Sequence, residues 1–398
     1  MMTAVKARSL GLPHAVRVSA RFPRTVILFL HNRYRTQGGE ERAVADLAWL
    51  VRERLGEPVE LLERDSLQLS AAAVARSLLR GGSDPEQVAT AVRRSGARIV
   101  HAHNLNPSFG PRALAAARTA GAKVVLHLHN YRLVCAVGTC VSSRGADCTR
   151  CQGRDTRPGV RLNCRRSRPE AAVYATALAR HSASLVAHAD AVIVPSRAAL
   201  DRLIALRAPL GATPVHVVGH VVRELEDVPP HPPPPHGFAL VAARLAPEKA
   251  VDVAIDACAR AGVALVVAGD GPERGRLEAR AHGRDVRFVG RLGPTELGRL
   301  RARAGVAVVT TRAHETFGLA AVEAMAAGLP TVATARGALT DLADGVSLVP
   351  AGDPARLAEA ITNARGNVAA GRRAHAAALR LVAPTAVAPK LAAVYAGL

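Results

Sequence analysis

Short apolar runs alternate with Ala- and Leu-rich stretches along most of the chain. The runs are rich in β-branched residues and favour strands, whereas the stretches between them favour helices. Strands that alternate with helices indicate parallel sheets covered by helices. We therefore expect an α/β protein with one series of strands at 25–31, 59–62, 98–101, 123–129 and 191–194, and a second at 238–242, 263–268, 286–289, 306–310, 330–334 and 346–349.

A proline-rich segment separates the two series. It reads Pro-Pro-His-Pro-Pro-Pro-Pro over 229–235, which is typical of a stiff linker. Each half has about 200 residues, an ordinary size for a domain. We predict a basic, disordered extension (1–23), a first Rossmann-like domain (24–225), a linker (226–236), a second Rossmann-like domain (237–383) and a C-terminal helix (384–398).

Two carboxylates, Glu315 and Glu323, lie eight positions apart at the start of an Ala-rich helix that Gly328 ends. The first turn of such a helix has free N–H groups and the positive end of the helix dipole, and it therefore seats phosphate. Eight helical residues span roughly 12 Å, so one acid flanks the phosphates on each side. An amphipathic helix with two solvated acids is the alternative. The predicted first turn contains Phe317, Gly318 and Leu319.

A basic turn follows the strand predicted at 238–242. It reads Arg244-Leu-Ala-Pro-Glu-Lys249, in a chain that has only four lysines among its 53 basic residues. The arginine fork and the compact lysine charge can together neutralise a diphosphate leaving group. An incidental basic turn at a strand end is the alternative.

The basic turn and the Glu-x7-Glu helix together resemble family 4 of the retaining glycosyltransferases. Further motifs match in the expected order, and the resemblance covers about residues 24–398. It implies the GT-B fold, in which two Rossmann-like, doubly wound parallel-sheet domains face a central cleft. It also implies that the first domain binds the acceptor and that the C-terminal helix crosses back onto it. The further motifs begin at Tyr34, His101, Leu126, Ala191, Val266 and Val286.

The resemblance implies transfer of a sugar from a nucleotide diphosphosugar, UDP- or GDP-linked, with retention of configuration and without a catalytic metal. The acceptor would be a cell-envelope glycan, a lipid-linked intermediate or a small metabolite. Arg244 and Lys249 would stabilise the leaving phosphate, Glu315 would contact the transferred sugar, and His129 would lie near that sugar and the acceptor. Donor contacts are expected from Gly38, Gly39, Gly269, Arg291, Leu292, Phe317, Gly318, Leu319 and Glu323.

Other interpretations stay open. Ala250 stands where the family usually has glycine, and Val218-Gly-His-Val221 stands where it often has Asn-Gly at the interdomain hinge. His101, His103 and His127 are interpreted as core histidines.

The alternative functions are a nucleotide-sugar epimerase of the same fold, a phosphorylase, or a basic membrane- or nucleic-acid-binding protein with a decayed donor site.

Five cysteines cluster within thirty residues, in a polar, Arg-rich insertion (135–168). Cys148 and Cys151 have zinc-ligand spacing, and Cys135 and Cys164 lie thirteen residues to either side. A structural zinc held by these four thiols is one prediction. Reduced thiols without metal are the alternative, and Cys140 could replace one ligand.

Composition limits the remaining possibilities for localisation and for binding partners. No apolar run reaches 18 residues, so we expect no membrane-spanning helix and a cytoplasmic protein. The net charge of +21 has three interpretations: an arginine-rich genome composition, attachment to an anionic membrane surface, or nucleic-acid binding. With only 3% aromatic residues the chain has few stacking platforms, which makes nucleic acid the least favoured partner.

Overall fold

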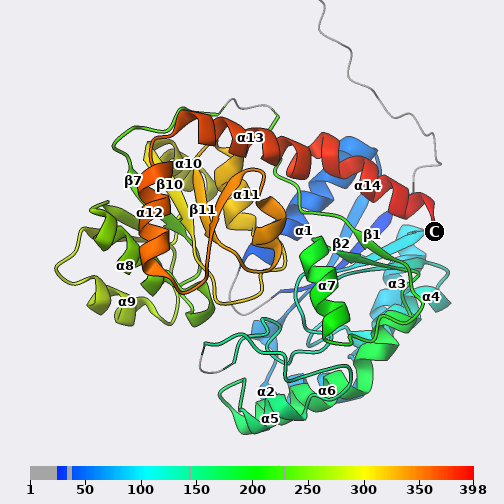
Figure 1. Ribbon diagram of the computed structural model, residues 1–398. Helices are drawn as coiled ribbons and strands as arrows, with labels where there is room; N and C mark the ends of the chain where they lie inside the picture. The colour runs from blue at the N-terminus through cyan, green and yellow to red at the C-terminus, as the bar shows by residue number, and fades with distance from the viewer. Residues whose placement is uncertain (1–24, 34–37, 143–144, 224, 227–229) are drawn as a thin grey trace, which may run out of the picture.

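The computed structural model describes residues 25–33, 38–142, 145–223, 225–226 and 230–398, and it contains two parallel sheets of six strands each (Figure 1). The first sheet has the strand order β2-β1-β3-β4-β5-β6. Its strands are β1 (Ile27–Arg33), β2 (Val59–Asp65), β3 (Ile99–Ala102), β4 (Lys123–His127), β5 (Ala191–Val194) and β6 (Val215–Val217).

The second sheet has the order β12-β11-β10-β7-β8-β9, which is the doubly wound order of the Rossmann fold. Neighbouring strands run parallel in both sheets. The strands are β7 (Phe238–Ala242), β8 (Leu265–Ala268), β9 (Val286–Gly290), β10 (Ala304–Val309), β11 (Thr331–Thr334) and β12 (Val346–Val349).

Helices connect the strands and cover both sheets. In the first half they are α1 (Gly39–Leu50), extended by the π-helical turn Val51–Leu55, α2 (Ala71–Arg80), α3 (Pro85–Ser95), α4 (Gly110–Thr119), α5 (Arg157–Arg161), α6 (Arg168–Ala187) and α7 (Arg197–Ala205). In the second half they are α8 (Val251–Ala261), α9 (Arg274–Ala281), α10 (Pro294–Arg303), α11 (Leu319–Ala326), α12 (Pro354–Ala364), α13 (Val368–Val382) and α14 (Pro384–Ala396). Short 3-10 turns lie at Ser66–Gln68, Pro247–Lys249 and Gly337–Leu342.

Successive side chains of the central strands enter cores on opposite faces of each sheet. In β1, Leu28 and Leu30 belong to one buried cluster, whereas Ile27 and Phe29 belong to another. This alternation follows from the two-residue period of a strand. Because both faces are covered, these strands consist of continuous apolar residues.

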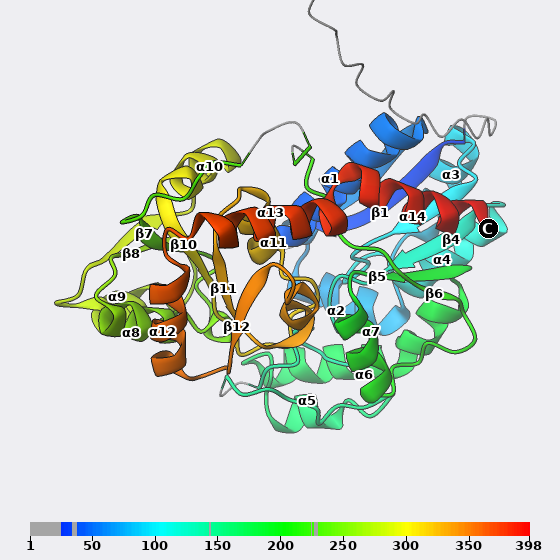
Figure 2. The ribbon, with the colours of Figure 1, turned by 45° about the horizontal axis from the view of Figure 1, so that its top comes forward.

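The chain ends by returning to the first domain. Helix α13 packs in the core of the second domain, and after Pro384 helix α14 places Val387, Leu391 and Val394 in the same buried cluster as Ile27 and Phe29. The two helices lie end to end across the top of both domains (Figures 1 and 2). The fold thus joins its two halves through α14 as well as through the linker.

One segment, Val368–Ala396, is long and apolar enough to cross a membrane by length and composition, whereas the sequence predicts no membrane-spanning helix. Its two helices meet at Pro384, and apolar side chains of both are buried against the protein. Length and composition are therefore weak evidence for a membrane span here.

The predicted α/β architecture with two parallel sheets is confirmed, and each expected strand overlaps an observed one. The sequence does not predict strand β6, because its three residues at the edge of the sheet form an apolar pattern that is too short to indicate a strand. The basic extension (1–23) and part of the linker (227–229) lie outside the described residues. The domain boundaries themselves stay predictions.

Leu391 provides a test of the contact between α14 and the first domain. The side chain is fully buried. Replacing Leu391 with Ala should lower the free energy of unfolding by about 2–5 kcal/mol, because a cavity remains in the core. Urea unfolding would measure this loss. Lys390→Ala, at an exposed position of the same helix, is the matched control and should change stability by no more than about 0.5 kcal/mol. An equally small effect at Leu391 would contradict the packing.

Candidate active site

The site lies where the strand order reverses in each sheet. In open parallel sheets, ligands bind beyond the carboxyl ends of the strands at this switch point. In the first sheet it lies between β1 and β3, followed by Gly38–Gly39 and by His103. In the second it lies between β7 and β10, which lead to Arg244–Lys249 and to Glu315.

Contacts between the domains bring the two switch points together. The Thr316 hydroxyl donates to the carbonyl oxygen of His129 at 3.0 Å, and the Ser196 hydroxyl donates to the carbonyl oxygen of Thr316 at 2.7 Å. The Tyr131 hydroxyl and His314 Nδ1 form a hydrogen bond of 3.1 Å. The segment before α11 is thereby fixed against the first domain.

Two helix N-termini meet at this boundary. Helix α1 begins at Gly39 and α11 at Leu319, and a Cβ at Gly39 would lie 3.3 Å from Leu319 Cδ2. Gly318, which caps α11, has φ +85°, and a Cβ there would lie 2.7 Å from Leu339 Cδ2. Helix N-termini attract anions, so a phosphate between α1 and α11 would face two positive dipole ends.

The predicted basic turn and the first acid of the helix motif meet directly. Lys249 Nζ lies 2.7 Å from Glu315 Oε1. Arg244 pairs with Glu248, its own neighbour in the turn, and keeps about half of its side chain exposed. Burial alone would raise the pKa of Glu315, but the charge of Lys249 and its hydrogen bond hold that pKa below its ordinary value. Glu315 is therefore an anion at neutral pH.

Glu323 has two partners that the sequence does not predict. Arg42 of α1 contacts Glu323 Oε1 at 2.8 Å, and Arg301 of α10 pairs with Oε2. Arg42 also lies 3.5 Å from Asp46, which pairs in turn with Arg223. Both carboxylate oxygens of Glu323 are thus engaged, so a ribose would have to share this carboxylate with guanidinium groups.

The other predicted donor residues lie along the same edge of the second sheet. A Cβ at Gly269 would lie 1.8 Å from the Ala243 carbonyl oxygen, so only glycine lets the chain after β8 pass beside the turn that contains Arg244. Arg291 and Leu292 follow β9, the outermost strand, two strands away from β7. Gly269 follows β8, the neighbour of β7. In the order of strands, Arg291 and Leu292 are therefore farther than Gly269 from the turn that contains Lys249.

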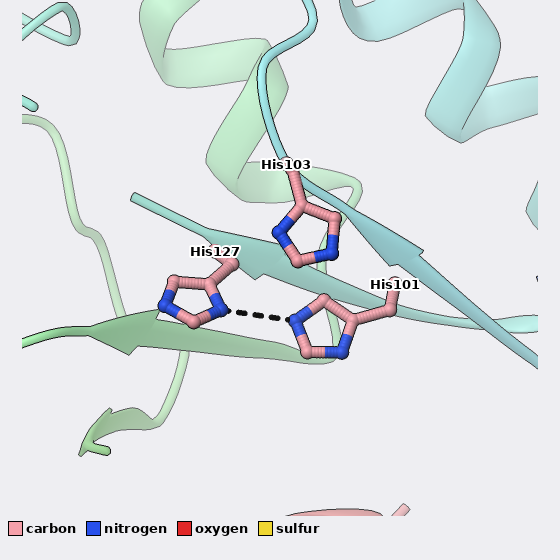
Figure 3. Close-up of side chains that lie close together, drawn as sticks. All are labelled: His101, His103 and His127. Carbon is pink, nitrogen blue, oxygen red and sulfur yellow. Dashed lines mark hydrogen bonds between the residues drawn. The ribbon is translucent and has the colours of Figure 1, made fainter. Parts of the chain in front are cut away.

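Four histidines gather at the carboxyl ends of β3 and β4: His101, His103 and His127 are buried, and His129 is half-buried. His101 Nε2 and His127 Nδ1 are 3.2 Å apart (Figure 3), and His103 Nδ1 and His129 Nε2 are 3.0 Å apart. The two pairs stack, with ring centroids 4.6 Å apart for His101 and His103 and 4.3 Å for His127 and His129. Burial lowers the pKa of all four rings, so they are neutral at pH 7.

These histidines could in principle hold a metal. Among the described residues, the groups of three ligand atoms within 4.8 Å of one another are His101–His103–His127 and His127–His129–His220. However, a metal lies in the plane of each imidazole that binds it, and stacked rings have parallel planes that cannot share one point. The ring geometry therefore favours two hydrogen-bonded pairs over a metal centre.

A cavity of about 40 Å³ opens beside this array. His103, His129, Asn130, Arg132 and Glu40 are among the residues that line it. In the described part of the chain, His129 Nδ1 and His103 Nε2 are buried without a protein hydrogen-bond partner. A hydroxylated ligand in this cavity could supply the partner for one of them.

The comparisons with known proteins bear on fold and family. Residues 238–367 match the model of the family described as "Glycosyl transferases group 1". The structure of Anabaena Alr3699/HepE in complex with UDP and glucose aligns over 94% of this chain and 100% of that one, with TM-score 0.63 and 21% identity. Sucrose-phosphate synthase from Thermosynechococcus elongatus aligns over 94% and 99%, with TM-score 0.69 and 17% identity. The fold is GT-B. This prediction is confirmed.

Similarity to curated proteins is confined to part of the chain. A GDP-mannose-dependent alpha-(1-6)-phosphatidylinositol dimannoside mannosyltransferase from Mycobacterium tuberculosis is 45% identical over 105 residues, which are 25% of this chain and 27% of the relative. A glycogen synthase from the same species is 42% identical over 156 residues, 36% of this chain and 37% of the relative. The chain thus matches about a third of these relatives' length. Together with the family model they support a glycosyltransferase and do not favour the epimerase or the basic binding protein.

The structure brings most of the predicted residues to one boundary between the domains. Arg244, Lys249, Glu315 and the first turn of α11 lie on one side, and His129 and Gly39 lie on the other. Their roles stay predictions. Arg42, Arg301 and the pairing of the histidines could not be found in the sequence, because they depend on contacts between distant segments.

Acid unfolding tests the Lys249–Glu315 pair. A depressed pKa in the folded state contributes stability above the ordinary glutamate pKa, and this stability is lost as pH falls through the folded pKa. Glu315→Gln should therefore cost about 1–3 kcal/mol at pH 7 and progressively less toward pH 3. Urea unfolding across this range measures the difference. Glu359→Gln, which removes an exposed pair with Arg356, should be nearly neutral at every pH. A pH-independent cost at Glu315 would show that packing, and not charge, accounts for the loss.

Proposed function

We propose that this protein is a retaining glycosyltransferase of family 4, which moves a sugar from a nucleotide diphosphosugar to a hydroxyl acceptor. The observation that carries the proposal is the meeting of Lys249, Glu315 and the N-terminus of α11 with His129 of the other domain. Cationic side chains, a helix dipole and a neutral histidine at one boundary suit a reaction in which negative charge develops on a phosphate.

The donor would span the N-terminus of α11. Its diphosphate would lie beside Arg244, Lys249 and the N–H groups of Phe317–Leu319, with Gly38 and Gly39 close by. The nucleoside would extend toward Glu323 and toward the loops that contain Gly269, Arg291 and Leu292. UDP- and GDP-sugars are the favoured donors. UDP occurs with HepE, and the mycobacterial relative is named for GDP-mannose, which supports this class of donor.

In the proposed reaction the bond between the sugar C1 and the β-phosphate oxygen breaks, and its electron pair stays on the phosphate. Arg244 and Lys249 stabilise that charge. The acceptor oxygen bonds to C1 on the same face, and its proton passes to the departing phosphate oxygen. Glu315 accepts hydrogen bonds from the transferred sugar, and His129 forms a neutral hydrogen bond to the sugar or the acceptor. No protein base and no catalytic metal are required.

The cavity beside His129 is the proposed acceptor site. Its lining combines amide, guanidinium and imidazole groups, which suits a hydroxylated acceptor. A cell-envelope glycan, a lipid-linked intermediate or a small polyol-like metabolite would each present such hydroxyls. We place the reaction in the cytoplasm, where nucleotide sugars are made, with the first domain facing the acceptor.

Donor binding and turnover test the proposal together. A thermal-shift panel of UDP-, GDP-, ADP- and dTDP-sugars should single out one nucleotide, and donor turnover with that sugar gives kcat. Arg244→Ala and Lys249→Ala should each lower kcat about 100-fold, because each removes one preorganised charge from the transition state. Arg260→Ala, an exposed arginine on α8, is the matched control and should retain full turnover. Equal turnover in all variants, or no response to any nucleotide sugar, would refute the proposal.

Vesicle binding tests whether the positive charge serves a lipid-linked acceptor. Arg161 and Arg168 are exposed on the Arg-rich insertion, whereas Arg165 stacks on Tyr174 and pairs with Glu170. Each basic residue near an anionic surface contributes about 1 kcal/mol at low salt. We expect salt-sensitive sedimentation with anionic vesicles and none with neutral ones.

Charge reversal distinguishes vesicle binding through a local basic surface from binding that depends only on the net charge of the protein. Changing Arg161 and Arg168 to Glu should reduce vesicle binding. The same change at Arg260 and Arg287, exposed in the second domain, alters net charge equally and should not reduce it. If both pairs of substitutions reduced vesicle binding equally, or if the protein did not sediment with anionic vesicles at low salt, the positive charge would reflect only the arginine-rich composition of the chain.

A further inference from the structure

Five cysteines from separate parts of the insertion line one small cavity. They are Cys135, Cys140, Cys148, Cys151 and Cys164. The cavity measures about 20 Å³, which accommodates one water-sized sphere. All six cysteines of the chain are free thiols, and the sixth, Cys258, is buried apart from the others in α8. A space for one atom surrounded by thiols suits a single metal ion.

The backbone around the cavity consists mostly of turns and has little regular secondary structure. Within it the structure describes only the short helix α5 and two isolated bridges, Val141–Asp147 and Gln152–Asp155. The guanidinium of Arg165, next to Cys164, donates to the carbonyl oxygen of Ala136, next to Cys135, at 3.0 Å. This contact joins the two ends of the segment. Such a segment needs an additional crosslink because it buries few apolar side chains.

Burial distinguishes the ligands among the five. Of the thiols Cys135 and Cys140, Cys140 is fully buried, whereas Cys135 is half-buried, as are Cys148, Cys151 and Cys164. A charged thiolate is accommodated more readily where it is partly exposed than where it is fully buried. Cys135 is therefore the better ligand of this pair.

We propose that Cys135, Cys148, Cys151 and Cys164 form a structural zinc site that crosslinks the insertion. Four thiolates around Zn²⁺ leave a net charge of about −2, which the surrounding arginines offset. A Zn–S distance of about 2.3 Å places the sulfurs about 3.8 Å apart. Among the described residues no three of these sulfurs lie within 4.8 Å of one another, so zinc binding draws the loop together.

The site would act on the boundary between the domains through Asp147, the neighbour of Cys148. Asp147 pairs with Arg202 of α7 at 2.7 Å and lies 3.8 Å from Arg336 of the second domain. Arg336 directly precedes Gly337, against which the backbone of Glu315 packs. A crosslinked insertion would hold Asp147 at this contact. The proposal does not depend on the proposed transferase activity.

Elemental analysis of the purified full-length protein tests the site. About one zinc per chain is expected. Cys148→Ser and Cys151→Ser should each release the zinc and make residues 135–168 sensitive to limited proteolysis. Cys258→Ser and Cys140→Ser are the matched controls, and both should retain the metal and the protease resistance. These readouts stay informative when catalytic activity is absent.

Three results would overturn the proposal. Protein without metal, whose thiols all titrate and which does not take up added zinc, would exclude the site. Zinc that persists in a Cys148→Ser/Cys151→Ser double variant would place the metal elsewhere, and its loss in His127→Asn would then identify the histidines. Loss of zinc in Cys140→Ser, with retention in Cys135→Ser, would reject the assigned ligand set.

Discussion

Parallel strand pairing is the constraint on which the rest of the structure depends. Because the strands of each sheet run in one direction, the loops after them emerge at the same edge, and the helices that follow begin there. Two such edges face each other, so backbone N–H groups, helix dipoles and the side chains after β1, β3, β4, β7 and β10 converge. The location of the site is a consequence of this topology, and its chemistry depends on the residues in those loops.

Ion pairs connect this edge of the second sheet to the opposite domain. Glu323 belongs to α11, yet one of its two arginine partners, Arg42, comes from the opposite domain. A ligand that approached Glu323 would therefore also act on an interdomain contact. The Lys249–Glu315 pair is different, since both residues belong to the second domain and their contact does not involve the first domain.

Burial decides what the histidines can do. An isolated histidine with an ordinary pKa near 6.5 would be partly charged in the cell. The four stacked rings are neutral because charging one would cost its desolvation and repel its neighbours. They are therefore suited to fixed hydrogen bonding and not to proton uptake, which is consistent with the proposed reaction, in which the acceptor proton passes directly to phosphate.

The sequence by itself determined the class of fold, the positions of nearly all strands along the chain, the turns that carry Arg244, Lys249 and Glu315, and the helix that carries Glu323. These features are local, because strand period, helix caps and turn residues act over a few positions. Only the tertiary structure decided that Arg42 and Arg301 hold Glu323, that His103 pairs with His129, that Arg165 points inward to Tyr174, and that five cysteines surround one cavity. Each of these contacts joins side chains from different elements, and their distances depend on how strands are ordered and helices are packed, which no local pattern encodes.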